Sequence, residues 1–128
     1  MKKQDIVTLA KGDFLLATAH CLPADEFYKW YKFRRQIALA LVDISKDESA
    51  LREQCGIPQG KTDVPQDAAA RFMEVRKKLL DENIAIDISS RIPFKYYKEI
   101  YDENKTEGRD IFASAKVEML VIDNLFEP

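Results

Sequence analysis

The most constraining feature of this sequence is an apolar stripe that repeats every seven residues between residues 24 and 55. Trp30, Ile37, Ile44 and Leu51 occupy successive positions of the repeat. A spacing of seven returns a side chain to the same face of an α-helix after two turns. The stripe therefore predicts one long amphipathic helix over residues 24–55, with these four side chains buried.

A second amphipathic helix is predicted over residues 66–82. Its apolar stripe consists of Ala68, Phe72, Val75 and Leu79. The polar loop over residues 57–64 is short, which favours an antiparallel hairpin of the two helices. We expect the first stripe to pack against the second. Residues 37–42 are all apolar, so we expect this part of the long helix to be buried on more than one side.

Three further helices are expected to flank the hairpin. Three- and four-residue apolar steps predict one helix over residues 3–20, which Leu22-Pro23 ends because the residue before proline avoids the α region. A short helix is predicted over residues 95–103. A last helix is predicted over residues 111–126 with Asp110 as its cap, although Val117, Met119 and Val121 also fit a strand.

The apolar period changes to two residues at Asn83. Ile84, Ile86 and Ile88 alternate with Ala85 and Asp87, which is typical of a half-buried strand. The segment Ile92-Pro93-Phe94 is the nearest candidate partner strand, and its proline restricts it to a sheet edge. The sequence therefore predicts an α+β fold that is mainly helical, with a small β element, as a single domain over residues 1–128. If the last segment is a helix, the strand edge stays open and favours a homodimer through residues 84–88, which we expect; if residues 117–122 form a third strand, the sheet closes within the chain and a monomer is sufficient.

Composition excludes several classes of protein. Hydrophobic residues make up 46% of the chain, which is enough for a folded core, and the net charge of −2 gives no general attraction to nucleic acid or an anionic membrane. The sequence contains no apolar run long enough to span a membrane. Charged residues interrupt the N-terminal apolar stretch, so we expect no export signal and a cytoplasmic location. In that compartment Cys21 and Cys55 are expected to be reduced and partly buried.

No catalytic, cofactor or metal site is predicted. Gly60-Lys61-Thr62 matches the end of a phosphate-binding loop, but the first glycine of that motif is missing because position 55 is cysteine. His20 is the only histidine. With Cys21 and Cys55 it lacks the paired spacing of a metal site. A nucleophile motif of the Gly-x-Ser-x-Gly type is absent, so an enzyme is disfavoured.

One segment is typical of a binding site. Lys29, Lys32, Arg34 and Arg35 alternate with Trp30, Tyr31 and Phe33 in the first half of the long helix. Basic and aromatic side chains together bind phosphates and stack on bases. A small nucleic-acid-binding protein is therefore the alternative function, which the negative net charge disfavours.

The order of features also resembles a family of short phage and prophage proteins of unknown function. The resemblance rests on Leu22-Pro23, on the stretch from Tyr31 to Arg35, on the stretch from Glu48 to Gly56, and on the stretch from Arg71 to Leu80 that leads into Ile84–Ile88. It implies a phage-related context and an assembly or accessory role, without an activity or site residues. The sequence thus favours a non-enzymatic interaction protein with a protein partner that remains to be identified.

Overall fold

The computed structural model describes residues 1–57, 60, 63–112 and 114–128. These residues form five α-helices and two short 3-10 helices, and their pairing between strands is limited to two isolated β-bridges. The elements in order are α1 (Lys3–Ala10), η1 (Phe14–Leu16), α2 (Ala24–Gln54), α3 (Gln66–Asp81), η2 (Phe94–Tyr96), α4 (Tyr97–Thr106) and α5 (Ala115–Leu125). The mainly helical architecture is confirmed, whereas the small β element of the α+β prediction is not formed in the described residues.

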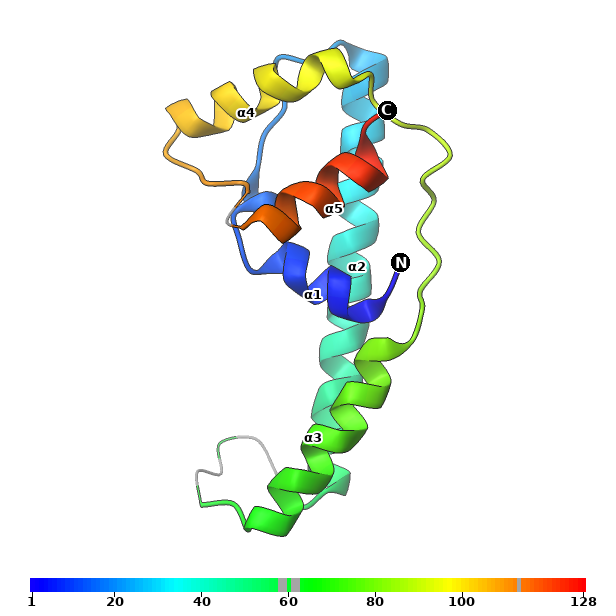
Figure 1. Cartoon of the computed structure of the whole chain (residues 1–128), viewed down its shortest axis with the longest axis vertical. Helices are drawn as coiled ribbons and strands as arrows, with labels where there is room; N and C mark the ends of the chain where they lie inside the picture. The colour runs from blue at the N-terminus through cyan, green and yellow to red at the C-terminus, as the bar shows by residue number, and fades with distance from the viewer. Residues whose placement is uncertain (58–59, 61–62, 113) are drawn as a thin grey trace.

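Helix α2 is the spine of the molecule, and α3 runs back along its C-terminal half (Figure 1). Both predicted helices are confirmed to within a residue at each end. The predicted loop over residues 57–64 lies partly outside the described residues, as do Lys61 and Thr62 of the phosphate-loop match. Arg76 and Glu48 join the two helices by an ion pair of 3.1 Å.

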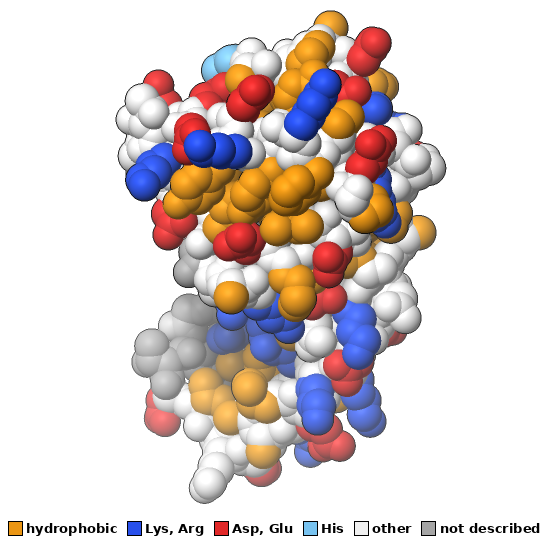
Figure 2. Space-filling view, turned by 45° about the horizontal axis from the view of Figure 1, so that its top comes forward, with side chains coloured by type: hydrophobic (Ala, Val, Ile, Leu, Met, Phe, Trp, Pro, Cys, Tyr) orange, Lys and Arg blue, Asp and Glu red, His pale blue; other side chains and the backbone are white. Residues whose placement is uncertain are grey.

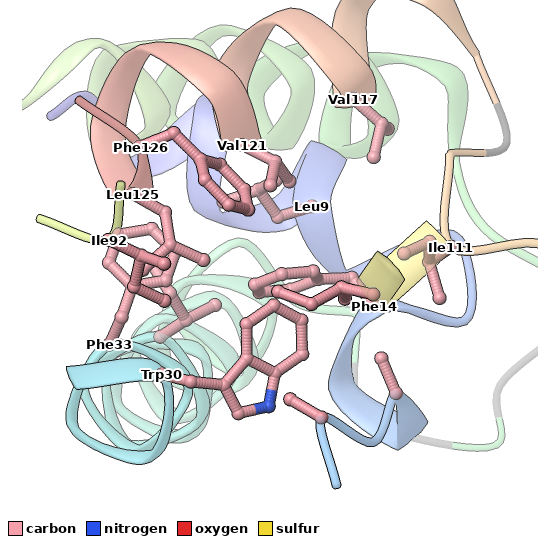
Figure 3. Close-up of a cluster of buried hydrophobic side chains, with 14 of the residues drawn as sticks. Leu9, Phe14, Trp30, Phe33, Ile92, Ile111, Val117, Val121, Leu125 and Phe126 are labelled. Atoms are coloured by element: carbon pink, nitrogen blue, oxygen red, sulfur yellow. The ribbon is translucent and has the colours of Figure 1, made fainter. Parts of the chain in front are cut away.

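Most of the core lies beside the N-terminal half of α2, and Leu80 of α3 packs against it. Trp30 and Phe33 each meet the ring of Phe14 edge to face, with centroids 5.7 and 5.9 Å apart. Leu9 of α1 and Val121 of α5 close the cluster from the other side (Figure 3). Trp30, Ile37 and Ile44 are buried as predicted, but Leu51, Phe72 and Val75 are half-buried. The predicted stripe is therefore covered mainly by α1, η1 and α5, and α3 covers its C-terminal end.

The predicted helix over residues 3–20 is too long. Helix α1 ends at Ala10, two residues before Gly12, and the chain continues through η1 into an extended segment at Ala17–Ala19. Glycine is a poor helix former, which favours an end at this point. Side chains of α4 form hydrogen bonds with this extended segment. The local sequence pattern does not predict this tertiary contact.

The C-terminal segment is helical rather than extended. Helix α5 begins after Ser114, whose Oγ accepts a hydrogen bond of 3.2 Å from the Val117 amide. Serine is a favourable cap because its oxygen satisfies an unpaired amide of the first turn. The predicted cap at Asp110 is wrong: its carboxylate accepts a hydrogen bond from the Phe112 amide before the helix begins.

The predicted strand over residues 84–88 is extended but pairs with no strand in the part of the chain that the structure describes. It belongs to a connection that runs from α3 to η2 along one side of α2 (Figure 1). The side-chain amide of Gln36 takes the place of a neighbouring strand: its Oε1 accepts from the Asp87 amide at 2.7 Å, and its Nε2 donates to the Asp87 carbonyl at 3.2 Å. Ile84, Ile86 and Ile88 are half-buried against the core, as their alternation predicts.

Both chain ends are bonded to this connection. The Ile84 amide donates to the Met1 carbonyl at 2.8 Å, and the Ile92 amide donates to the Leu125 carbonyl at 2.8 Å. The two isolated bridges, Lys2 with Asn83 and Ile92 with Phe126, result from these contacts. The predicted homodimer needs free main-chain groups at residues 84–88, and those of Ile84 and Asp87 are engaged within the chain.

The middle of α2 is buried on one side. Leu39 and Val42 are 54% and 50% exposed, so the prediction that residues 37–42 are buried on several sides is wrong. Helices α1 and α3 both contact α2, and the buried side of its middle portion carries Ile37, Ala40 and Ile44. The opposite side of the helix faces solvent.

Candidate functional site

Lys29 and Lys32, two of the four basic residues of the predicted nucleic-acid-binding site, bind to the connection between α3 and η2. Lys29 Nζ lies 3.1 Å from the Glu26 carboxylate and donates to the Arg91 carbonyl at 3.2 Å. Lys32 Nζ lies 3.3 Å from the Asp87 carboxylate. Hydrogen bonds from Ser89 and the contact with Lys32 lower the pKa of Asp87 to about 2. These two cations are therefore paired on the side of α2 that carries the extended segment.

The other two predicted basic residues point to different sides of α2. Arg34 donates to the carbonyls of Ala17 at 2.8 Å and of Leu15, so it anchors the segment after η1. Arg35 is exposed, and its guanidinium lies 3.4 Å from the Tyr31 hydroxyl. The structure thus spreads Lys29, Lys32, Arg34 and Arg35 around the helix instead of gathering them into one basic patch.

A polar cluster that the sequence did not reveal joins the segment Ala17–Ala19 to α4. Asn104 is fully buried; its Oδ1 accepts from the Thr18 amide at 2.9 Å, and its Nδ2 donates to the Thr18 carbonyl at 2.8 Å. Arg109 donates to Asn104 Oδ1 and to Thr18 Oγ1, both at 3.0 Å. Every one of these side chains has a protein partner, so the cluster acts as a structural clasp.

Glu103 completes this clasp beside the N-terminus of α2. Its carboxylate accepts from Thr18 Oγ1 at 2.6 Å and from the amides of His20 and Cys21 at 3.0 and 2.8 Å. Burial raises the pKa of Glu103, but these hydrogen bonds lower it more, so the pKa lies below its ordinary value. The carboxylate is thus held ionised by bonds to the main chain.

The two cysteines differ in their exposure. Cys21 is exposed, contrary to the expected partial burial, whereas Cys55 is half-buried. Desolvation and the nearby Glu103 raise the pKa of Cys21 to about 11, which keeps it a thiol rather than a nucleophilic thiolate. Within the described residues, no group of three or more His, Cys, Asp or Glu side chains is arranged to hold a metal ion.

The most distinctive surface feature is a row of four stacked aromatic rings along α4. In spatial order the rings are Phe94, Tyr97, Phe112 and Tyr101, with successive centroids 5.3, 5.4 and 5.8 Å apart and planes within 16° of parallel. Lys105 Nζ lies over the last ring, 5.9 Å from its centroid. Figure 2 shows hydrophobic side chains gathered in a band over α4 and α5, with charged side chains around it. We call Phe94, Tyr97, Phe112 and Tyr101 the aromatic row.

Buried contacts hold the aromatic row in place. The ring of Phe126, which is in the core, meets both Phe94 and Tyr97 edge to face. The Tyr97 hydroxyl donates to Glu118 of α5 at 2.9 Å, and desolvation together with this bond raises the pKa of Tyr97. At the far end, a pocket of about 330 Å³ is lined by Tyr101, Lys105 and Arg109 with their neighbours. The row is thus packed against Phe126 of the core and bonded to α5.

The sequence carries part of the signal for the aromatic row. Phe94 is three residues before Tyr97, and Tyr101 is four residues after it, which places all three on one helical face. Phe112 comes from the chain between α4 and α5, so its insertion between two tyrosines depends on how that segment folds back. Nothing in the spacing predicts that Thr18 and Asn104, 86 residues apart, form a clasp.

None of the described helices combines the length and the apolar character that crossing a membrane requires. No protein-family model, curated protein or solved structure matches the chain.

Proposed function

We propose that this chain is a non-enzymatic interaction protein that binds a protein partner through the aromatic row. The single observation that supports this most is the row itself: four stacked rings, of which Phe94 is 48% exposed and the other three are half-buried. Aromatic side chains are enriched at the centres of protein interfaces because they bury large areas at small cost in conformational entropy. A row held by Phe126 and Glu118 is preorganised, which lowers the cost of binding further.

The stacking favours a protein partner over nucleic acid at this surface. Tyr97 and Phe112 each have a ring stacked on both faces, and Lys105 lies over Tyr101. A base needs a free ring face on which to stack. Phe94 stacks with Tyr97 alone, so the row leaves a free ring face at that end and few others on which bases could stack.

The biological setting forms part of the same proposal. The resemblance to short phage and prophage proteins implies an assembly or accessory role, and a cytoplasmic location is consistent with that role. The partner is then a protein made or used when a prophage is expressed.

Capture from the native host tests the proposal, with and without prophage induction. The wild-type chain is compared with a Phe94→Ser, Tyr101→Ser variant and with a Met73→Ser control, because Met73 is 61% exposed on α3 and remote from the row. We expect one protein to be captured by the wild type and the control but lost with the row variant, and to bind again when both proteins are purified. Equal capture by all three chains would refute the role of the row.

Nucleic-acid binding remains the second candidate function. Arg35 supports it, because this cation is exposed beside Tyr28 and Tyr31, whose ring centroids are 6.4 Å apart. The other three basic residues are engaged within the protein, which weakens the candidate.

A further inference from the structure

Helix α2 carries a second stripe that lies opposite its buried one. Positions 28, 35, 42 and 49 are spaced by seven residues, as are 30, 37, 44 and 51 of the buried stripe. Every residue of the second stripe is exposed, and so are the neighbours that broaden it. We call this surface the outward strip; its members used below are Tyr28, Tyr31, Arg35, Leu39, Val42, Lys46, Ser49 and Glu53.

The outward strip has the character of an uncovered helix interface. Tyr28, Leu39 and Val42 are 60%, 54% and 50% exposed. Single exposed apolar residues are ordinary, but Tyr28, Leu39 and Val42 lie on the same face of one helix, and a group of exposed apolar side chains marks an interaction surface. A shallow groove of about 590 Å³ runs along its C-terminal half, lined by Val42 together with short side chains such as Ser45 and Ser49. Short side chains allow a second helix to approach closely.

The charges on the strip are arranged to complement a second copy in the antiparallel orientation. Arg35 lies on the N-terminal side of Val42, and Glu53 lies on the C-terminal side. In an antiparallel pair centred on Val42, Ser49 of one copy is level with Arg35 of the other, and Glu53 is level with Tyr31. The Arg35 guanidinium already reaches back to the Tyr31 hydroxyl, so it lies near the level that Glu53 of the second copy occupies. Helical side chains lean toward their own N-terminus, which brings Glu53 toward Arg35 as well.

The parallel orientation lacks this complementarity. It sets Arg35 against Arg35, Lys46 against Lys46 and Glu53 against Glu53, and like charges across a helix pair disfavour that arrangement. The antiparallel pair forms two Arg35–Glu53 contacts by symmetry, with the two Val42 side chains meeting at the dyad.

We propose that two copies of this chain associate through the outward strips of α2 as an antiparallel, two-fold symmetric dimer. This inference is independent of the proposed function, because the strip and the aromatic row share no residue. The dimer presents two aromatic rows, so a partner with two matching sites binds it with increased avidity.

Light scattering and sedimentation equilibrium of the full chain test the dimer across a micromolar dilution series. We expect a mass near twice 14.8 kDa at the higher concentrations. Val42→Glu places two carboxylates at the dyad and should abolish the dimer, whereas Met73→Glu on α3 should leave it unchanged. All the substituted residues are exposed, and an unchanged helical circular dichroism spectrum confirms that each variant folds.

Charge exchange tests the orientation. Arg35→Glu and Glu53→Arg should each weaken the dimer roughly tenfold, because each converts two attractive contacts into repulsive ones. The double variant should recover most of the wild-type affinity. A mass of 14.8 kDa at every concentration overturns the proposal, as does a dimer that survives Val42→Glu, which would place the contact elsewhere, such as at residues 84–88. A double variant no tighter than the single ones overturns the antiparallel arrangement.

Discussion

At the scale of single residues, two side-chain amides bond to extended segments in the way that a neighbouring strand would. Asn104 bonds both main-chain groups of Thr18, and Gln36 bonds both main-chain groups of Asp87. Each amide carries a donor and an acceptor in the spacing of a peptide group, so it satisfies an extended segment as a neighbouring strand would. This explains why two extended segments remain ordered without a sheet.

Removing the buried amide should destabilise the protein. Asn104→Ala leaves the Thr18 amide and carbonyl without their partners, and we expect the free energy of unfolding to fall by about 2–3 kcal/mol. Asn124→Ala is the matched control, because Asn124 is half-buried and donates one bond, to the Leu120 carbonyl; its cost should stay below about 1 kcal/mol. Urea denaturation measures both, and equal losses would contradict the role of Asn104.

The carboxylate of Glu103 should make stability depend on pH. Because its pKa is lowered in the folded state, its contribution is present above the pKa of the unfolded chain, about 4.3, and is lost as the pH falls through the lower folded value. Unfolding free energy should therefore drop in this acidic range, and Glu103→Gln should flatten the drop. Denaturation at a series of pH values measures it, with the exposed Glu107→Gln as control; identical slopes for wild type and Glu103→Gln would refute the assignment.

At the scale of elements, α2 organises its neighbours through side chains on several faces. One face buries Trp30, Ile37 and Ile44, a second holds the connection through Lys32 and Gln36, and a third is the outward strip. Lys32 and Gln36 on the second face thus have a structural role. The sequence pattern alone did not distinguish this role from ligand binding.

The contact of Gln36 with the connection should be visible in amide hydrogen exchange. Gln36→Ala removes the acceptor for the Asp87 amide, so we expect that amide to exchange roughly 2- to 10-fold faster, the range given by one ordinary hydrogen bond. Gln54→Ala, at the exposed end of α2, serves as control. Unchanged protection of Asp87 in Gln36→Ala would show that other contacts order the segment.

At the scale of the whole molecule, charge separates the two candidate functions. The chain carries a net charge of −2, and Lys29, Lys32 and Arg34 are engaged by acceptors of the same chain. Nucleic-acid binding depends on cations that are free to neutralise phosphates. The aromatic row and the outward strip lie on different elements, so the two proposed protein-binding surfaces are independent of each other.

Nucleic acid should therefore not bind measurably at physiological salt. If weak binding occurs at low salt, changing Lys29, Lys32 and Arg35 to Ala should flatten its salt dependence, and Lys77→Ala should not. Gel shifts across a salt series test this. A clear shift at physiological salt that the triple change abolishes would reverse the ranking of the two functions.

The sequence by itself determined the long helices, because a repeat of seven over α2 and a three- and four-residue stripe over α3 are local properties of the chain. It also determined the alternating burial of Ile84, Ile86 and Ile88. Tertiary structure decided which residues contact each segment. Gln36, and not a second strand, bonds to Asp87. Thr18 is not part of the first helix and bonds to Asn104 of α4 instead. It also left Leu39 and Val42 exposed and inserted Phe112 between Tyr97 and Tyr101. Periodicity reports which side of an element is apolar, whereas the neighbour that covers that side depends on contacts between residues far apart in the chain.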